Sequence, residues 1–122
     1  MTKVAIVEDD ALINQMYRMK FESEGFDVQV ADNGKSGLEM IQTFQPNLVL
    51  LDLQMPEMTG DQVLKSMREQ EWGKNTPVII LTNTGLEESP KILKELNVLS
   101  YFVKAELTPS QIVTKAKEAL GI

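Results

Sequence analysis

Side chains that could do chemistry follow several apolar runs of the 122-residue sequence. They are Glu8, Asp9 and Asp10 after residues 3–7, Asp52 after 47–51, Thr82 at the end of 77–82, and Lys104 after 100–103. Carboxylates held close together repel one another, so some of them must take up protons or bind a cation. An ammonium group and a hydroxyl beside them would bind an anion. If the fold brings these groups together, they suit phosphoryl transfer to a carboxylate, in which positioning and charge neutralisation do most of the work.

The composition limits which metals and which reactions are available. The sequence has no His and no Cys. This excludes imidazole catalysis, a phosphohistidine, disulfides and thiolate metal sites. Oxygen ligands alone suit a hard ion, so the expected ion is Mg²⁺, with Mn²⁺ as the alternative, and not Zn²⁺.

The charge and hydropathy of the chain restrict its partners and its location. Twelve basic against 18 acidic side chains give a formal charge of −6, which argues against binding to nucleic acid by this domain alone. No apolar run approaches the roughly 18 residues of a membrane span, and no signal-peptide pattern is present. We therefore expect one soluble cytoplasmic domain over residues 1–122 that binds no membrane.

Five apolar runs alternate with segments of helical period. The expected strands are 3–7, 27–31, 47–51, 77–82 and 100–103, and the expected helices are 11–24, 34–44, 60–71, 90–96 and 108–120. Ser89 and Thr108 each stand as a helix N-cap before a Pro. Gly25 and Asn97 are expected to end the helices before them, because both residue types tolerate left-handed backbone.

Five β-α units joined by short connections indicate an α/β fold, a flavodoxin-like five-stranded parallel sheet with helices on both faces. The expected strand order is 2-1-3-4-5, with ligands bound where the carboxyl ends of strands 1 and 3 part. The run 27–31 alternates more than the others and is expected at an edge. In this order the strands that end in Glu8, Asp52, Thr82 and Lys104 are neighbours, so these side chains meet in one crevice.

Each of these residues also has an ordinary structural explanation. Asp52 alone could be a turn residue, and the acids at 8–10 could be a solvated helix start. Thr82 could be a simple strand residue, and Lys104 could pair with Glu106. Their coincidence at adjacent strand ends favours a shared function.

Four segments, in this order and at this spacing, resemble the receiver domains of two-component response regulators. They are IVEDD (6–10), LLDLQMPEMTG (50–60), VIILT (78–82) and YFVK (101–104), and the resemblance covers the whole chain. It implies a phospho-acceptor signalling domain. Such a domain is not an enzyme for other substrates, since it catalyses only its own phosphoryl transfer and autodephosphorylation.

The resemblance implies a role for each residue of the crevice. Asp52 would accept a phosphoryl group from a phosphohistidine of a histidine kinase or a histidine phosphotransfer protein. Mg²⁺ would be held by the carboxylates of Asp9 and Asp52 and the backbone carbonyl of Gln54, with Glu8 acting through water. Lys104 would pair with the phosphoryl oxygens.

The resemblance further implies a switch and an output surface. Thr82 would move toward the phosphoryl group, and Tyr101 is similar to the aromatic residue that turns inward when this happens. A downstream protein, or a second copy of the phosphorylated chain, would bind the face of helix 90–96, strand 100–103 and helix 108–120. Candidate residues of this face are Lys91, Lys94, Tyr101 and Lys115.

Ile13 resembles the position that contacts the phosphoryl donor protein. It is expected beside, but not on, a core stripe formed by Leu12, Met16 and Met19 of the first helix. Asp10 matches a helix-start position, so it is left out of the metal ligands.

Two positions depart from the family pattern. Ala105 follows Lys104 where the family usually has Pro, often after a cis bond. A cis bond without Pro costs about 3 kcal/mol, so either this bond is trans and the loop differs, or strain is kept. Asn83 stands where Ala, Ser or Gly is usual, and its bulk would narrow access to the phosphoryl group.

Pro56 and Gly60 are expected to shape the loop after Asp52.

Other functions remain open at this point. An independent phosphohydrolase could use the same fold and an aspartyl nucleophile, but no second acid is placed near Asp52 as a general acid. A phosphate-independent receiver-like interaction module would be favoured by an incomplete acidic pocket, whereas every expected residue type is present. A nucleic-acid-binding regulator would require further chain, since no helix-turn-helix or basic patch lies within these residues.

Overall fold

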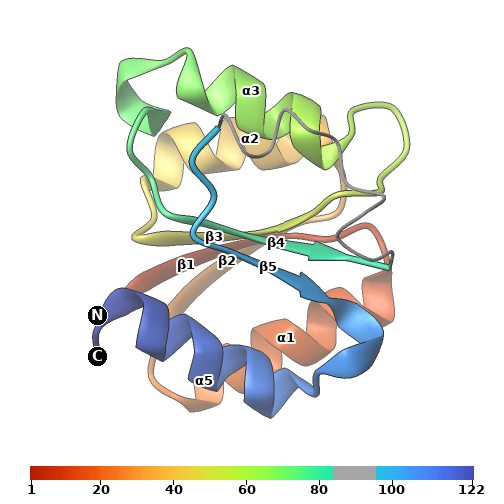
Figure 1. Ribbon diagram of the computed structural model, residues 1–122, viewed down its shortest axis with the longest axis vertical. Coiled ribbons are helices and arrows are strands. Elements are labelled where there is room, and N and C mark those ends of the chain that lie inside the picture. Colours follow the sequence, from red (N-terminus) through yellow and green to blue (C-terminus); the bar gives the residue numbers. More distant parts are fainter. Residues whose placement is uncertain (84–95) are drawn as a thin grey trace.

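The chain forms a five-stranded parallel sheet with helices on both faces (Figure 1). The computed structural model describes residues 1–83 and 96–122. The strands are β1 (Lys3–Val7), β2 (Asp27–Ala31), β3 (Leu48–Asp52), β4 (Val78–Thr82) and β5 (Ser100–Val103). Their order is β2-β1-β3-β4-β5. The predicted fold class and strand order are therefore confirmed, and the alternating run 27–31 is an edge strand.

Four α-helices cover the sheet in the described part of the chain. They are α1 (Ala11–Ser23), α2 (Gly34–Phe44), α3 (Gly60–Arg68) and α5 (Pro109–Leu120). α2 and α3 lie on one face, and α1 and α5 lie on the other (Figure 1). Short 3₁₀ helices follow α3 and β5, at η1 (Glu71–Gly73) and η3 (Lys104–Glu106). No helix among the described residues is long and apolar enough to cross a membrane.

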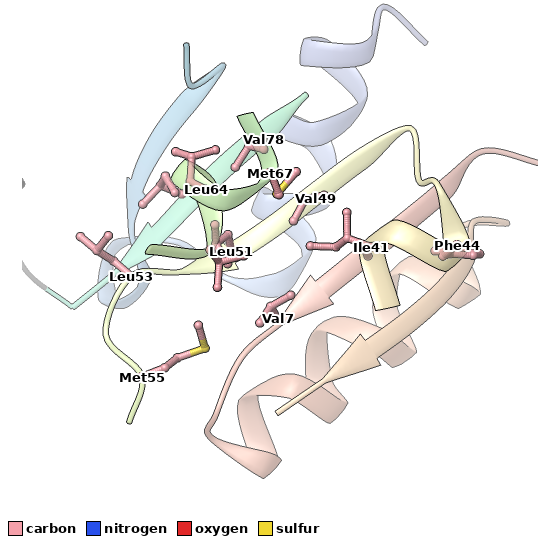
Figure 2. Close-up of a cluster of buried hydrophobic side chains, with 13 residues drawn as sticks. Val7, Ile41, Phe44, Val49, Leu51, Leu53, Met55, Leu64, Met67 and Val78 are labelled. Atoms are coloured by element: carbon pink, nitrogen blue, oxygen red, sulfur yellow. The ribbon is translucent and has the colours of Figure 1, made fainter. Parts of the chain in front are cut away.

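Two apolar clusters hold the layers together, one on each face of the sheet. Figure 2 shows the cluster beneath α2 and α3, in which Val7, Val49 and Leu51 of the sheet meet Ile41 and Leu64 of the helices. β1, β3 and β4 are covered on both faces, which explains their continuously apolar sequences. The central strands are thus fixed in register by side chains on both sides, and their ends are rigidly placed.

Most predicted element boundaries lie within a residue of the observed ones. The helix at 34–44 has its predicted bounds, and Thr108 caps α5, where its hydroxyl accepts a hydrogen bond from the Gln111 N–H at 3.2 Å. Gly25 and Asn97 have left-handed backbone, with φ of 89° and 61°. The predicted helix 90–96 and its cap Ser89, together with Lys91 and Lys94, lie outside the described residues.

The helix predicted at 60–71 ends earlier, at Arg68. The chain then turns back on the helix end, so that a Cβ on Gly73 would stand 2.6 Å from the carbonyl oxygen of Met67. The Arg68 guanidinium donates to the carbonyls of Gly73 and Thr76 at 2.8 Å each. The expected last helical turn is therefore absent, and η1, which contains Trp72, follows α3.

The core stripe predicted for the first helix is wrong. Leu12 and Met19 are 68% and 62% exposed, and Met16 is exposed as well. The buried residues of α1 are instead Asn14, Tyr17 and Phe21. The two aromatic side chains fill the space against the sheet, and Phe21 makes an edge contact with Phe26 at 5.3 Å between ring centroids. The side chains of Leu12, Met16 and Met19 consequently face outward.

Candidate functional site

The sheet carries its chemical groups to one edge. Asp52 is the last residue of β3 and Thr82 is the last residue of β4, while Glu8 and Lys104 directly follow β1 and β5. The register pairs Asp52 with Leu81 and Thr82 with Val103, so the four strands end side by side. Glu8 and Asp52 are each 1% exposed and Thr82 is fully buried. The predicted convergence of these side chains is therefore observed.

Lys104 lies between two buried carboxylates. Its Nζ is 2.5 Å from Glu8 Oε1 and 3.1 Å from Asp52 Oδ1, and its side chain is only 7% exposed. The alternative partner Glu106 is exposed and belongs to η3. The peptide bond between Lys104 and Ala105 is trans, as are all bonds between described residues. Ala105, where Pro was expected, is thus accommodated by a trans bond within η3.

Three carboxylates form a group that could hold a cation. One oxygen each of Glu8, Asp9 and Asp52 lies within 4.8 Å of the other two. Asp52 Oδ2 is buried and has no hydrogen-bond partner in the described part of the chain. A buried carboxylate oxygen without a partner costs free energy, and a hard cation would satisfy it. The donor set fits Mg²⁺, because all its ligands are oxygens.

The same surroundings shift the pKa values of the acidic and basic groups in the site. Burial, together with hydrogen bonding and charge from Glu8, raises the pKa of Asp52 to about 8, although Lys104 acts in the opposite direction. For Lys104, burial lowers the pKa, but the hydrogen bond to Glu8 and the charge of Asp52 outweigh this and raise it overall. For Asp9, burial raises the pKa, but hydrogen bonds with Asp52 and Glu8 lower it overall. The Asp52 carboxyl group therefore holds its proton more tightly than an ordinary Asp side chain does.

The acidic loop after β1 is held by the start of α1. Asp10 caps this helix, and its Oδ1 accepts from the N–H groups of Leu12 and Ile13 at 3.0 and 3.1 Å. The Asn14 Nδ2 donates to the carbonyls of Glu8 and Ala31, both at 3.0 Å. Sequence reasoning missed Asn14. The signal was its spacing from Tyr17, which places a polar side chain on the buried face of the helix.

The loop after β3 backs Asp52 closely. A Cβ on Gly60 would stand 2.2 Å from the carbonyl oxygen of Asp52, so only glycine fits where α3 begins. The Gly60 N–H donates to the Leu53 carbonyl, and the Leu53 N–H donates to the Leu81 carbonyl, both at 3.0 Å. Asp52 is thus held from β4 and from α3, which agrees with the shaping role expected of Gly60.

Gln54 makes contacts that sequence reasoning did not anticipate. Its N–H donates to Asp52 Oδ1 at 3.2 Å. Its side-chain Oε1 accepts from the Asn83 N–H at 3.1 Å and from the Thr82 hydroxyl at 3.4 Å. The side chain therefore crosses from the β3 loop to the end of β4, beside the predicted acceptor.

Ile13 and Tyr101 lie near the site on opposite sides of the sheet. Ile13 is half-buried and lines a hollow of about 280 Å³ together with Met16, Asn83 and Lys104. Tyr101 pairs in register with Ile80 and packs partly buried against the cluster beneath α2 and α3. Its hydroxyl is buried and has no hydrogen-bond partner among the described residues. Lys115 of the predicted output face is exposed.

Comparison with known proteins identifies the family. Residues 4–117 match the model of the response regulator receiver domain. The chain is 34% identical over 118 residues to the transcriptional regulatory protein SrrA of Staphylococcus aureus, covering 97% of this chain and 47% of SrrA. It is 32% identical over 102 residues to the regulatory protein AtoC of Escherichia coli, covering 84% of this chain and 22% of AtoC. The chain thus spans less than half the length of these relatives.

A solved structure agrees over nearly the full length. The chemotaxis response regulator CheY4 of Vibrio cholerae superposes with a TM-score of 0.89 at 28% identity, covering 98% of each chain. The family match begins one residue into β1 and includes the rest of the sheet and every side chain of the crevice. The chain belongs to the response regulator receiver domain family of two-component signalling.

Proposed function

We propose that Asp52 accepts a phosphoryl group from a phosphohistidine of a histidine kinase or a histidine phosphotransfer protein. The observation that carries this proposal is the state of the Asp52 carboxylate. One oxygen is bonded to Lys104 at 3.1 Å, and the other is buried without a partner among the described residues. In the transfer, an Asp52 oxygen attacks phosphorus, the new P–O bond forms, and the P–N bond to the donor imidazole breaks.

Mg²⁺ is the proposed cofactor, with Mn²⁺ as the alternative. The carboxylates of Asp9 and Asp52 and the backbone carbonyl of Gln54 would hold it, with Glu8 acting through water. The grouping of Glu8, Asp9 and Asp52 oxygens within 4.8 Å supports this assignment. When bound, the ion would neutralise charge on the phosphoryl oxygens. Lys104, whose Nζ is 3.1 Å from Asp52 Oδ1, would supply a second positive charge.

The phosphoryl group would act on the output face through Thr82 and Tyr101. Added charge at Asp52 favours movement of the Thr82 hydroxyl toward it. The buried Tyr101 hydroxyl has no hydrogen-bond partner within residues 1–83 and 96–122, so a different ring position is accessible at low cost. The partner of this face, which includes Lys115, would be a downstream protein or a second phosphorylated copy.

The donor protein would dock on α1 beside the acceptor. Leu12, Met16 and Met19 form an exposed apolar stripe on this helix. Ile13 continues that surface into the hollow that reaches Lys104. An apolar surface next to the acceptor suits a donor that must bring its imidazole within bonding distance of Asp52.

We further propose that residues 1–122 act as one domain that turns over no other substrate and binds no nucleic acid itself. A cytoplasmic location suits a chain without Cys. The phosphate-independent interaction module is the alternative function, and it predicts partner binding that is unaffected by Asp52→Asn.

Intact mass spectrometry after incubation with acetyl phosphate tests the proposal. The wild-type chain should gain one phosphoryl group in the presence of Mg²⁺ and none in the presence of a chelator. Asp52→Asn should gain none under either condition. Absence of an adduct on the wild type, together with no binding of beryllium fluoride as a stable phosphoryl mimic, would refute the acceptor function.

A further inference from the structure

The outer edge of β2 carries unpaired backbone groups. β2 is the end strand of the sheet, and β1 is the strand that pairs with it. The Asp27 N–H donates to the Thr2 carbonyl at 2.9 Å, so Asp27 and every second residue after it bond to β1. The N–H and C=O groups of Val28 and Val30 therefore point away from the sheet, and they have no hydrogen-bond partner in the described part of the chain.

A hollow of about 740 Å³ lies along this edge, between α1 and α2. α1 lines it from Ala11 to Glu22, which is about 16 Å of helix. α2 lines it with Ser36 and Met40, and Val30 lines it from β2. An extended segment of about five residues has the same length. The space beside the edge is therefore long enough for a sixth strand.

The two ends of this edge are acidic. Asp27 begins β2 and Asp32 directly follows it, and both are exposed. Neither pairs with a cation among the described residues. Arg18, which lines the hollow, already pairs with Glu22 at 3.3 Å. An added strand with a basic residue near each end would therefore complement both aspartates.

A second copy of the chain fits this edge poorly. Two copies of β2 in antiparallel pairing would bring Asp27 of one copy close to Asp32 of the other, and like charges that close destabilise a strand pair. Each chain also carries a formal charge of −6, so two copies repel one another. The charges therefore favour a basic segment of another protein.

We propose that the β2 edge binds an extended basic segment of a partner protein by strand addition. The segment exchanges main-chain hydrogen bonds with Val28 and Val30, and its Lys or Arg side chains lie beside Asp27 and Asp32. β2 contributes no side chain to the carboxylate crevice. This surface is therefore separate from the proposed acceptor Asp52, and it binds its partner without phosphorylation.

The probe is the peptide acetyl-Lys-Val-Thr-Val-Thr-Lys-amide, and the backbone amide signals of the unphosphorylated chain report its binding. Binding should be saturable, and the amide protons of Val28 and Val30 should move downfield as they gain acceptors. A peptide with Glu in place of both Lys residues should bind at least tenfold more weakly. Absence of saturable binding by the basic peptide, shifts confined to residues away from β2, or equal binding of the two peptides would overturn the proposal.

Two N-methylated forms of the basic peptide test strand addition without changing the protein. Each form carries N-methyl groups on one set of alternate residues and keeps both charges. One set of N–H groups faces β2 and the other faces solvent, so one form should lose binding and the other should keep it. Equal binding of the two forms would show that charge alone attracts the peptide, contrary to the proposal.

Asp32→Lys reverses one charge at the edge, and Glu118→Lys is the matched control, because Glu118 is exposed on α5. Both variants change the net charge equally. Asp32→Lys should bind the basic peptide about fivefold more weakly than Glu118→Lys does. Equal affinities would refute the placement of the peptide. Dimerisation of the wild-type chain through β2, seen by sedimentation equilibrium and lost in Asp32→Lys, would assign the edge to a second copy and overturn the proposal as well.

Discussion

The two ends of the sheet are built from similar strands but differ in what they bury. All four buried polar or charged residues of the described chain lie at or beside the carboxyl end: Glu8, Asn14, Asp52 and Thr82. At the amino end the strands begin with backbone hydrogen bonds, such as those of the Asp27 N–H to Thr2 and the Asn47 N–H to Lys3, both at 2.9 Å. Among the described residues, the amino end buries no polar or charged side chain, whereas the carboxyl end buries two carboxyl groups beside the Lys104 ammonium.

This difference shows where the chain accepts a cost in stability. Burying two carboxylates beside one ammonium is expensive, and apolar residues of similar size would often stabilise a fold better. An arrangement of this kind is expected at sites where local rules are broken for function. Substitutions at the carboxyl end are therefore expected to change stability and phosphorylation more than substitutions at the amino end.

The largest expected effect on stability is that of Lys104→Met. Its removal leaves Glu8 and Asp52 buried without their cation, and breaking such a group costs about 3–5 kcal/mol of the free energy of unfolding. Denaturant titration measures this loss. The control is Lys117→Met, because Lys117 pairs with Glu24 at 3.6 Å where both side chains are more than a third exposed. Lys117→Met should cost less than about 1 kcal/mol of the free energy of unfolding. Equal losses in both variants would show that Lys104 does not stabilise the buried carboxyl groups.

Stability of the metal-free protein should depend on pH through Asp52. Its pKa is raised to about 8 in the folded protein from 3.8 in the unfolded chain, so the folded state binds the proton more strongly. The contribution is complete below pH 3.8 and is lost as the pH rises to about 8. The difference in unfolding free energy between wild type and Asp52→Asn should therefore shift in favour of the variant over this window. Thermal unfolding at several pH values measures it, and a constant difference would count against the raised pKa.

Gly60→Ala should disturb the carboxyl end of the sheet without changing the charge of any side chain. The added Cβ would meet the Asp52 carbonyl oxygen at 2.2 Å, so the loop must shift at a cost of about 1–3 kcal/mol. Phosphorylation of Asp52 by acetyl phosphate should slow as well. Gly121→Ala is the control, since its φ of 71° is strained for Ala but no atom lies within 4 Å of the new Cβ. It should lose some stability and keep the wild-type phosphorylation rate.

The smallest expected effect lies at the amino end. Asn47→Ala removes the hydrogen bond from the Lys3 N–H to Asn47 Oδ1, which is 2.8 Å long and exposed. We expect a loss of about 0.5–1 kcal/mol in the free energy of unfolding and no change in phosphorylation. A slower phosphorylation would show that the amino end of the sheet influences the site at the carboxyl end.

The parts of the fold that follow from local patterns could be predicted from the sequence. Continuous apolar runs set the strands, and the Thr108 cap set the start of α5. The inner face of α1 could not be predicted this way. The apolar residues Leu12, Met16 and Met19 have helical spacing, yet the aromatic side chains of Tyr17 and Phe21 are the ones that are buried. Periodicity identifies an apolar stripe but does not say whether the sheet or another protein covers it.

For the candidate site, too, one part could be predicted from the sequence and another part could not. Residue types at strand ends were sufficient to predict that Glu8, Asp52 and Lys104 meet, because parallel strands end at a common edge. The bridge from Gln54 to Asn83 depends on the path of two loops and on one side-chain conformation. No spacing rule encodes such a contact.

If Asp52 is the proposed acceptor, a bound cation must displace the proton that its raised pKa holds in the metal-free protein. The most direct test follows the ¹³C chemical shift of the Asp52 side-chain carboxyl carbon as a function of pH, with and without Mg²⁺. We expect a titration near pH 8 in the metal-free protein, displaced to lower pH by Mg²⁺. A titration near the ordinary value of Asp in both conditions would contradict it.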